Sequence, residues 1–252
     1  MPAWWARPAV GVRPRAAVLV LPEVFGVNAW VRSVAERLAQ HGYAALAIST
    51  FWRTAPQLDV GYDAVGLAAG REHRDHVRAD QLLADVAAAA AWLQTAHAAD
   101  GLAQRPLGCV GFCFGGHLAM LAATVPAIAA TCDFYGARVS SYRPGAAVDG
   151  EGRLLDPSAA PTLAVLPQIP GRLWCFRGDA DPLIPAAEIA AIEAALTAAN
   201  GGVPASASNA RHRLLIAPGA GHGYLCEARA DFQPQAAATA WDAMLELFAA
   251  EL

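Results

Sequence analysis

The sequence predicts an α/β fold in which helices cover both faces of a mostly parallel central sheet. Short apolar runs alternate along the chain with longer segments of helical periodicity, and such alternation is typical of a parallel sheet covered by helices. The composition agrees: 56% of the residues are hydrophobic and 16% are charged, which excludes disorder as the main state. A length of 252 residues suits one α/β unit, so we expect a single domain over residues 1–252.

Six strands are expected where the apolar runs are short and bounded by turn residues. In chain order they lie at residues 16–21, 44–48, 107–110, 129–134, 173–176 and 213–216. Segments with apolar residues at helical spacing predict helices at residues 28–40, 77–96, 116–124, 186–198 and 234–252. Every strand but the fourth is followed by a helix before the next strand begins, which is the chain order of a parallel sheet.

Two stretches break this alternation, at residues 54–75 and 137–171, and the second is rich in proline and glycine. Loops of this length in a compact domain are usually functional or mobile. We expect both to shape a substrate pocket, although a solvated insertion without a role fits residues 137–171 about as well.

One cysteine lies on the turn between the third strand and the helix that follows it. Cys113 stands in Gly111-Phe112-Cys113-Phe114-Gly115-Gly116, and the small residues two before and two after it allow a tight turn that projects its side chain. Backbone N–H groups at the start of the next helix favour a thiolate over a thiol. The pattern suits a nucleophile, and the hexapeptide by itself suits a buried cysteine in a glycine-rich connection equally well.

Two further residues complete the set that a cysteine nucleophile needs. Asp181 follows the strand at 173–176 and His222 follows the strand at 213–216, so both should lie with Cys113 at one edge of the sheet. His222 would take or hold the proton of Cys113, and Asp181 would orient the imidazole. Asp179 competes for the acid role, and we favour Asp181 because it lies nearer the strand-to-helix turn.

The remaining composition argues against other classes of function. With a net charge of −4 and no cluster of basic residues, nucleic-acid binding is not expected. His73 and His76 share a helical face but have no further ligands at convincing spacing, so neither a metal nor another cofactor is expected. Five cysteines without a C-x-x-C pair suit free thiols in a reducing cytoplasm, and no secretory signal or membrane span is predicted.

Several segments together resemble the dienelactone hydrolase family over nearly the whole chain. They are Leu21-Pro22-Glu23-Val24-Phe25-Gly26-Val27-Asn28, His41-Gly42-Tyr43-Ala44, the Cys113 turn, Asp133-Phe134-Tyr135-Gly136, Asp181 and His222-Gly223-Tyr224. The Glu23 segment and the cysteine turn are the most specific, because most α/β hydrolases carry serine as the nucleophile and lack that glutamate. The resemblance implies an α/β-hydrolase fold and a carboxylic ester hydrolase that cleaves small lactones or esters through a cysteine acyl-enzyme.

The resemblance also implies roles for residues beside the nucleophile. Glu23 would contact the thiol or be displaced on substrate binding, and so help to form the thiolate when substrate is present. Its alternatives are structural: it could cap the helix region at 28–40 or pair with an arginine, because a buried carboxylate needs a polar partner. The oxyanion hole of this fold would be formed by the backbone N–H groups of Phe114 and Val24.

Substrate-binding residues are assigned from the same resemblance. Dienelactone-cleaving members bind the substrate carboxylate with arginines, whose geometry suits that group. One arginine should precede the helix at 77–96, where spacing cannot choose among Arg71, Arg74 and Arg78. The second should come shortly after the histidine, but Cys226 occupies that place and Arg229 follows three residues later. The apolar pocket candidates are Phe25, Trp52, Tyr135 and Tyr224.

The sequence therefore predicts a cytoplasmic, cofactor-independent cysteine esterase or lactonase that acts on a small molecule as a monomer or small homo-oligomer. Two alternatives stay open. An acyltransferase would use the same residues and differ in excluding water. A binding protein on the same scaffold could use its thiol to sense oxidants, although a complete triad argues against it.

Overall fold

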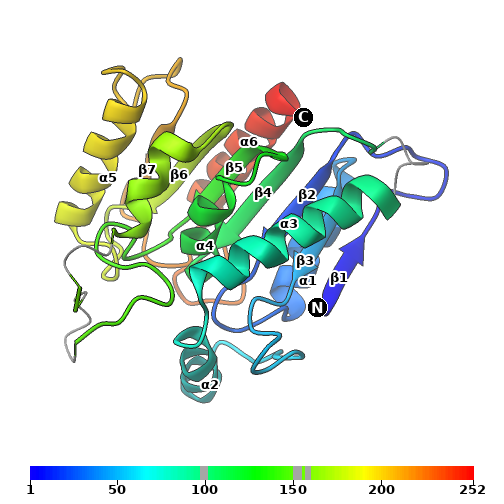
Figure 1. Ribbon diagram of the computed structural model, residues 1–252, viewed down its shortest axis with the longest axis horizontal. Helices are drawn as coiled ribbons and strands as arrows, with labels where there is room; N and C mark the ends of the chain where they lie inside the picture. Colours follow the sequence, from blue (N-terminus) through cyan, green and yellow to red (C-terminus); the bar gives the residue numbers. More distant parts are fainter. Residues whose placement is uncertain (97–101, 150–154, 157–159) are drawn as a thin grey trace.

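The computed structural model describes residues 1–96, 102–149, 155–156 and 160–252. Within them, seven strands form one sheet in the order β1-β3-β2-β4-β5-β6-β7 (Figure 1). The strands are β1 (Ala3–Ala6), β2 (Ala17–Leu21), β3 (Ala44–Ile48), β4 (Leu107–Phe112), β5 (Ile128–Phe134), β6 (Arg172–Gly178) and β7 (Arg213–Ala217). All neighbours pair in parallel except β1, which runs antiparallel to β3 at the edge. The predicted mostly parallel α/β sheet is confirmed.

The central strands are apolar on both sides because helices cover both faces of the sheet. Leu19 and Leu21 of β2 point to a core that includes residues of α3 (Ala79–Ala96), α4 (Phe114–Ala122) and α5 (Ala186–Ala199). Val18 and Val20 point to the other core, against α1 (Ala29–Gln40) and α6 (Pro234–Glu251). Figure 1 shows these two helical layers on either side of the sheet.

All six predicted strands and five predicted helices are present, with ends that differ from the expected ones by at most two residues. The sequence analysis missed β1, a four-residue strand whose first two residues are exposed, because an edge strand need not form a buried apolar run. It also missed two elements inside the irregular stretches. They are α2 (Ala64–Arg74) and the 3₁₀ helix η2 (Thr162–Gln168).

Helix α2 gives almost no periodic signal because its only buried residues are Gly66 and Gly70. Within the predicted irregular stretch 137–171, residues 150–154 and 157–159 lie outside the described part of the chain. None of the helices in the described ranges is long and apolar enough to cross a membrane.

The four residues expected to carry chemistry lie just after the carboxyl ends of four parallel strands, or on the turns that follow them. Glu23 follows β2, Cys113 follows β4, Asp181 follows β6 and His222 follows β7. This edge of a parallel sheet is where ligands bind in open α/β folds.

Candidate active site

Cys113 occupies a strained turn between β4 and α4. Its backbone has φ 54°, a left-handed value that is uncommon for a residue with a side chain. A hydrogen bond to the neighbouring strand β5 fixes this turn, because the Cys113 N–H donates to the carbonyl of Phe134 at 3.0 Å. Cys113 is partly exposed, unlike the other four cysteines, which are all buried free thiols. The backbone therefore presents this one sulfur to a cavity.

The acid and the imidazole form a buried pair beside that cavity. His222 Nδ1 lies 2.8 Å from Asp181 Oδ2, and both residues are 4% exposed. The other Asp181 oxygen accepts from the Leu183 N–H at 2.8 Å, which fixes the carboxylate. Asp179 has a different partner, the Gly219 N–H, and is exposed. Of the two candidate acids, Asp181 is thus the one in contact with the imidazole.

The second imidazole nitrogen is available for chemistry. His222 Nε2 is buried and has no hydrogen-bond partner among the described residues. Burial of the ring disfavours its charged form, but the negative charge of the Cys113 sulfur and the bond to Asp181 outweigh burial and raise the pKa of His222 to about 10. The surroundings of the ring therefore favour its protonated form.

Cys113 and His222 line one cavity of about 380 Å³, large enough for a small ester. The sequence candidates Val24, Phe25, Arg71 and Arg74 line the same cavity. Other lining residues, not singled out from the sequence as pocket residues, are Tyr62, Asp63, Ala64, Leu67, Leu183, Ala228, Ala230 and Asp231. The sequence analysis did not select Tyr62 and Leu67 because it did not predict α2. The available signal for that helix was its N-cap, Asp63, whose carboxylate accepts from the Gly66 N–H.

Three predicted pocket residues do not line this cavity. Trp52 donates its indole N–H to Asp85 of α3 at 2.9 Å and so packs away from Cys113. Tyr135 is fully buried and lies edge-on to the His222 ring, with centroids 5.3 Å apart. Tyr224 lines another cavity, between β7 and α6. Aromatic residue type could not separate these packing positions from a lining position.

Glu23 pairs with an arginine, one of the alternatives raised by the sequence. It is fully buried, and its Oε1 lies 3.1 Å from Arg229 Nη1. The guanidinium also lies over the rings of Phe25 and Tyr62, 6.0 and 5.9 Å from their centroids. Glu23 Oε2 has no partner in the described structure. The cap of α1 is instead the side chain of Asn28.

The arginines near α2 differ in their surroundings. Arg71 lines the cavity and makes no ion pair within the described residues, whereas Arg74 lines it while bonded to Asp75 at 2.7 Å. Arg78 bonds Asp80 and borders a different cavity. Arg229 lines the Cys113 cavity although it lies three residues beyond the expected position. It reaches the cavity because the chain turns after Gly223, where the Cys226 N–H donates to the Gly223 carbonyl.

The two backbone groups expected to bind an oxyanion have no hydrogen-bond acceptor among the described residues. Val24 lines the cavity, and Phe114 begins α4, where the first N–H groups of a helix are unpaired. Gly115 brings the two segments together: a Cβ there would lie 2.2 Å from the Leu21 carbonyl oxygen and 2.5 Å from that of Pro22. The start of α4 therefore packs directly on the residues that precede Val24.

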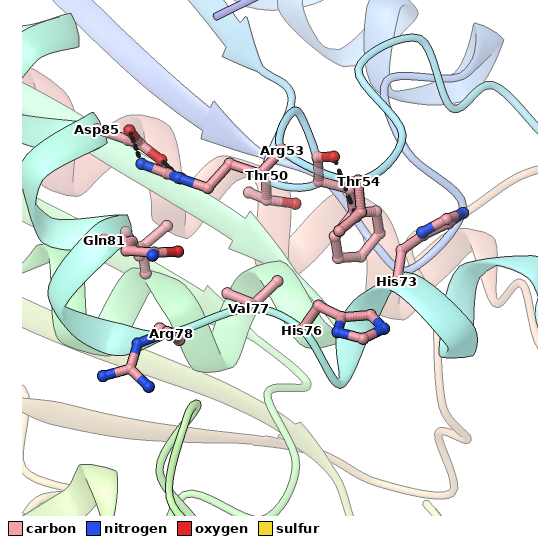
Figure 2. A pocket seen from close by; sticks show the side chains of 11 residues that line it. Thr50, Arg53, Thr54, His73, His76, Val77, Arg78, Gln81 and Asp85 are labelled. Atoms are coloured by element: carbon pink, nitrogen blue, oxygen red, sulfur yellow. Dashed lines mark hydrogen bonds and ion pairs between the residues drawn. The ribbon is translucent and has the colours of Figure 1, made fainter.

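A small cavity of about 20 Å³ lies at the α2–α3 junction (Figure 2). Arg53 and Asp85 form an ion pair on its wall, and His73 and His76 lie at its α2 side. It has room for about one water molecule. Among the described residues, no group of three or more histidine, cysteine or acidic side chains could hold a metal ion.

Comparisons with known proteins place this architecture and sequence in a family. The model of the dienelactone hydrolase family matches residues 1–252. A Synechocystis sp. protein with the provisional name carboxymethylenebutenolidase is 36% identical over 244 residues, covering 97% of this chain and 89% of its own. A Bradyrhizobium sp. protein, provisionally named a 2-oxo-3-(5-oxofuran-2-ylidene)propanoate lactonase, is 30% identical and covers 95% and 85%.

A solved structure agrees with these sequence matches. The crystal structure provisionally described as a dienelactone hydrolase from Klebsiella pneumoniae is 28% identical, has a TM-score of 0.76, and covers 99% of this chain and 92% of that one. The family model spans every residue, and the relatives span nearly all of them. This chain therefore belongs to the dienelactone hydrolase family, whose members are ester and lactone hydrolases.

Proposed function

We propose that this protein hydrolyses small lactones or esters through a Cys113–His222–Asp181 triad and a thioester intermediate. One observation carries the proposal. His222, which is hydrogen-bonded to Asp181, lines the same cavity as Cys113, and Cys113 is partly exposed whereas the other four cysteines are buried. Asp181 accepts the Nδ1 proton, so Nε2 is the nitrogen left for proton transfer.

In the first half-reaction, the Cys113 thiolate attacks the ester carbonyl and a C–S bond forms. The carbonyl oxygen becomes an oxyanion, which the N–H groups of Val24 and Phe114 bind. The C–O bond then breaks, and the His222 imidazolium gives its proton to the leaving oxygen. With a lactone, the released hydroxyl stays attached to the acyl group.

In the second half-reaction, neutral His222 takes a proton from water, and the hydroxide oxygen attacks the thioester carbonyl. The same two N–H groups bind the second oxyanion. The C–S bond breaks, the carboxylic acid leaves, and the thiolate beside the imidazolium is restored. Acyl transfer would differ only in the acceptor that replaces water.

Glu23 is connected to the Cys113 cavity through Arg229, which lines that cavity. Its buried carboxylate has one oxygen on Arg229 and the other without a partner in the described structure. A substrate carboxylate that draws Arg229 into the cavity would remove the positive charge that balances Glu23, and Glu23 would then relay the Cys113 proton to His222 and return it after product release. Thiolate formation would thus be linked to substrate binding.

The proposed substrates carry a carboxylate near the scissile bond. Arg71 and Arg229 both line the cavity, and guanidinium groups suit bidentate recognition of carboxylates. The Bradyrhizobium relative is named for a lactone that bears a propanoate group. A cytoplasmic location belongs to the same proposal, because a reducing compartment keeps the five thiols free.

Turnover of p-nitrophenyl acetate, with and without Cys113, tests the chemistry. We expect Cys113→Ala to lose at least about a thousandfold in kcat/KM, and mass spectrometry of wild type mixed with ester to show an acyl adduct on Cys113. Cys109→Ala is the matched control, because that thiol is fully buried within β4. Equal turnover by wild type and Cys113→Ala would remove Cys113 from the mechanism.

A further inference from the structure

The loop that carries Val24 is packed against the residues that the sequence left irregular. We call residues 22–28 the oxyanion loop. The carbonyl of Phe25 accepts from the Val60 N–H at 3.2 Å, and the Asn28 side chain donates to the Val60 carbonyl at 3.3 Å. On the same side, Gly26 has φ +77°, and a Cβ there would lie 1.9 Å from the Leu58 carbonyl oxygen. The oxyanion loop is therefore fixed along one side by residues 58–60.

Helix α2 closes on the same loop at Val24 itself. A Cβ added to Gly70 would lie 2.0 Å from the Val24 carbonyl oxygen and 2.8 Å from its carbonyl carbon. Real Cβ contacts are never this short, and both opposing atoms are backbone, so no side chain can rotate to make room. The helix backbone thus rests directly on the carbonyl group of Val24.

Nothing within the helix itself calls for glycine at this position. Gly70 lies in the interior of α2 with no left-handed φ, a setting in which alanine is the better helix former. The three atoms nearest to an added methyl group all belong to Val24, and the two closest are backbone atoms. The contact also lies one residue before Arg71, so the same turn of helix faces the cavity.

We propose that Gly70 is a positioning residue for the oxyanion hole: by allowing α2 to touch the Val24 carbonyl, it fixes the orientation of residue 24 and hence the direction of its N–H. The inference rests on the proposed function, in which that N–H binds the oxyanion. Helix α2 is suited to the task because its N-terminus is held by the Asp63 carboxylate on the Gly66 N–H at 2.7 Å. Displacing the helix by the width of a methyl group moves a donor whose strength depends on sub-ångström placement.

The variant Gly70→Ala tests this directly with p-nitrophenyl acetate, a neutral ester that needs no arginine. We expect kcat to fall at least about tenfold with KM changed less than about threefold, because the lost interaction exists only in the transition state. Ala68→Gly is the matched control: it weakens the same helix at an exposed position away from the loop. Its kcat should stay within about twofold of wild type.

Alkylation of Cys113 by iodoacetamide separates positioning from general damage. Displacement at the saturated carbon forms no oxyanion, so Gly70→Ala should react within about twofold of wild type while its ester turnover is reduced. Wild-type kcat in Gly70→Ala would overturn the inference. Equal losses in alkylation and turnover would also overturn it, since they would mean that the substitution disturbs the whole site.

Two further variants keep the test decisive. If Gly70→Ala does not fold, Gly66→Ala displaces α2 from a position that does not line the cavity, because a Cβ there would lie 2.1 Å from the Gly61 carbonyl oxygen; we expect a kcat loss of about threefold or more with alkylation unchanged, and an unchanged kcat would overturn the inference. Cys113→Ala is assayed in parallel. If it is inactive while Gly70→Ala behaves like wild type, only the Gly70 inference fails, whereas a Cys113→Ala that retains turnover removes the proposed function and the inference with it.

Discussion

Arg229 is the residue through which the proposed site would recognise a charged substrate. It touches the Glu23 carboxylate, lies over two aromatic rings, and borders the cavity that Cys113 and His222 share. Burial opposes its charge, but Glu23 and Cys113 outweigh burial and raise the pKa of Arg229, so it stays a guanidinium. A fixed cation at this place suits an anionic substrate.

Arg229→Lys keeps this charge and removes the bidentate geometry. For an activated ester that bears a carboxylate, we expect KM to rise about tenfold, because one good charge-assisted contact is lost. The neutral ester with the same acyl chain should change less than about twofold, as measured by steady-state kinetics on the matched pair. Equal changes for both esters would show that Arg229 serves only to hold Glu23.

At this scale, the sequence selected the three members of the proposed triad because each follows its own strand. The sequence could not show that Arg229 lines the cavity. The family pattern expects an arginine at the position of Cys226, and only the turn after Gly223 brings residue 229 to the cavity. Nor could it distinguish Phe25, which lines the cavity, from Trp52, which packs on Asp85. Both are aromatic residues in segments that follow a strand.

At the level of elements, His117 ties the nucleophile helix α4 to the segment that contains η2. Its Nδ1 lies 2.8 Å from the Ala137 carbonyl, which can only accept, so Nδ1 carries the proton. Nε2 then accepts from the Thr162 hydroxyl at 2.7 Å. Burial, with Arg138 and Arg177 nearby, lowers the pKa of His117 to about 4. The neutral ring is part of the folded state.

This pairing predicts a pH-dependent stability. Between about pH 6.5 and pH 4, unfolded His117 binds a proton that the folded ring does not, so stability falls as pH falls through this window. We expect His117 to contribute a loss of about 2 kcal/mol in the free energy of unfolding from pH 7 to pH 5. Urea unfolding at both pH values measures it.

His117→Asn is the comparison for that measurement, because its amide can still bond Ala137 or Thr162 but does not titrate. Its loss between the two pH values should be smaller by about the same 2 kcal/mol. His212, whose pKa burial likewise lowers to about 4, remains in both proteins and cancels. Identical pH dependence in the two proteins would contradict the assignment.

For the molecule as a whole, a buried ion pair joins two central strands beneath the site. Asp133 of β5 and Arg177 of β6 are both fully buried, and Arg177 Nη1 donates to the Asp133 carbonyl at 2.8 Å and to its Oδ1 at 3.1 Å. Asp133 Oδ1 also accepts from the Gly136 N–H at 3.0 Å. The pair thereby links the sheet to the turn after β5.

Breaking one side of this pair should cost far more than breaking a surface pair. Asp133→Asn leaves an uncompensated guanidinium in the core, and we expect the free energy of unfolding to fall by about 3–5 kcal/mol. Adding Arg177→Met should recover part of that loss, as chemical denaturation would show. Asp80→Asn makes the same substitution in an exposed pair and should have little effect. A small effect of Asp133→Asn would mean that the charge is relieved by water.

By itself, the sequence determined six of the seven described strands and most of the flanking helices, because these depend on local signals: buried apolar runs and helical spacing. Residues on the turns after strands likewise selected the members of the proposed triad. Such signals can be read from the sequence without knowledge of the fold. The edge strand β1 and helix α2 were not predicted because they lack such signals. The first two residues of β1 are exposed, and the only buried residues of α2 are two glycines.

Only the tertiary structure decided what surrounds the triad. The pairing of Glu23 with Arg229 spans 206 residues of chain, and the contact of Gly70 with Val24 involves no side chain on the glycine. Neither leaves a periodic or compositional trace, because long-range pairing and close backbone approach are set by how the elements pack. The candidate nucleophile could be predicted from its own turn, whereas the residues proposed to bind the substrate and the oxyanion come together only when the chain is folded.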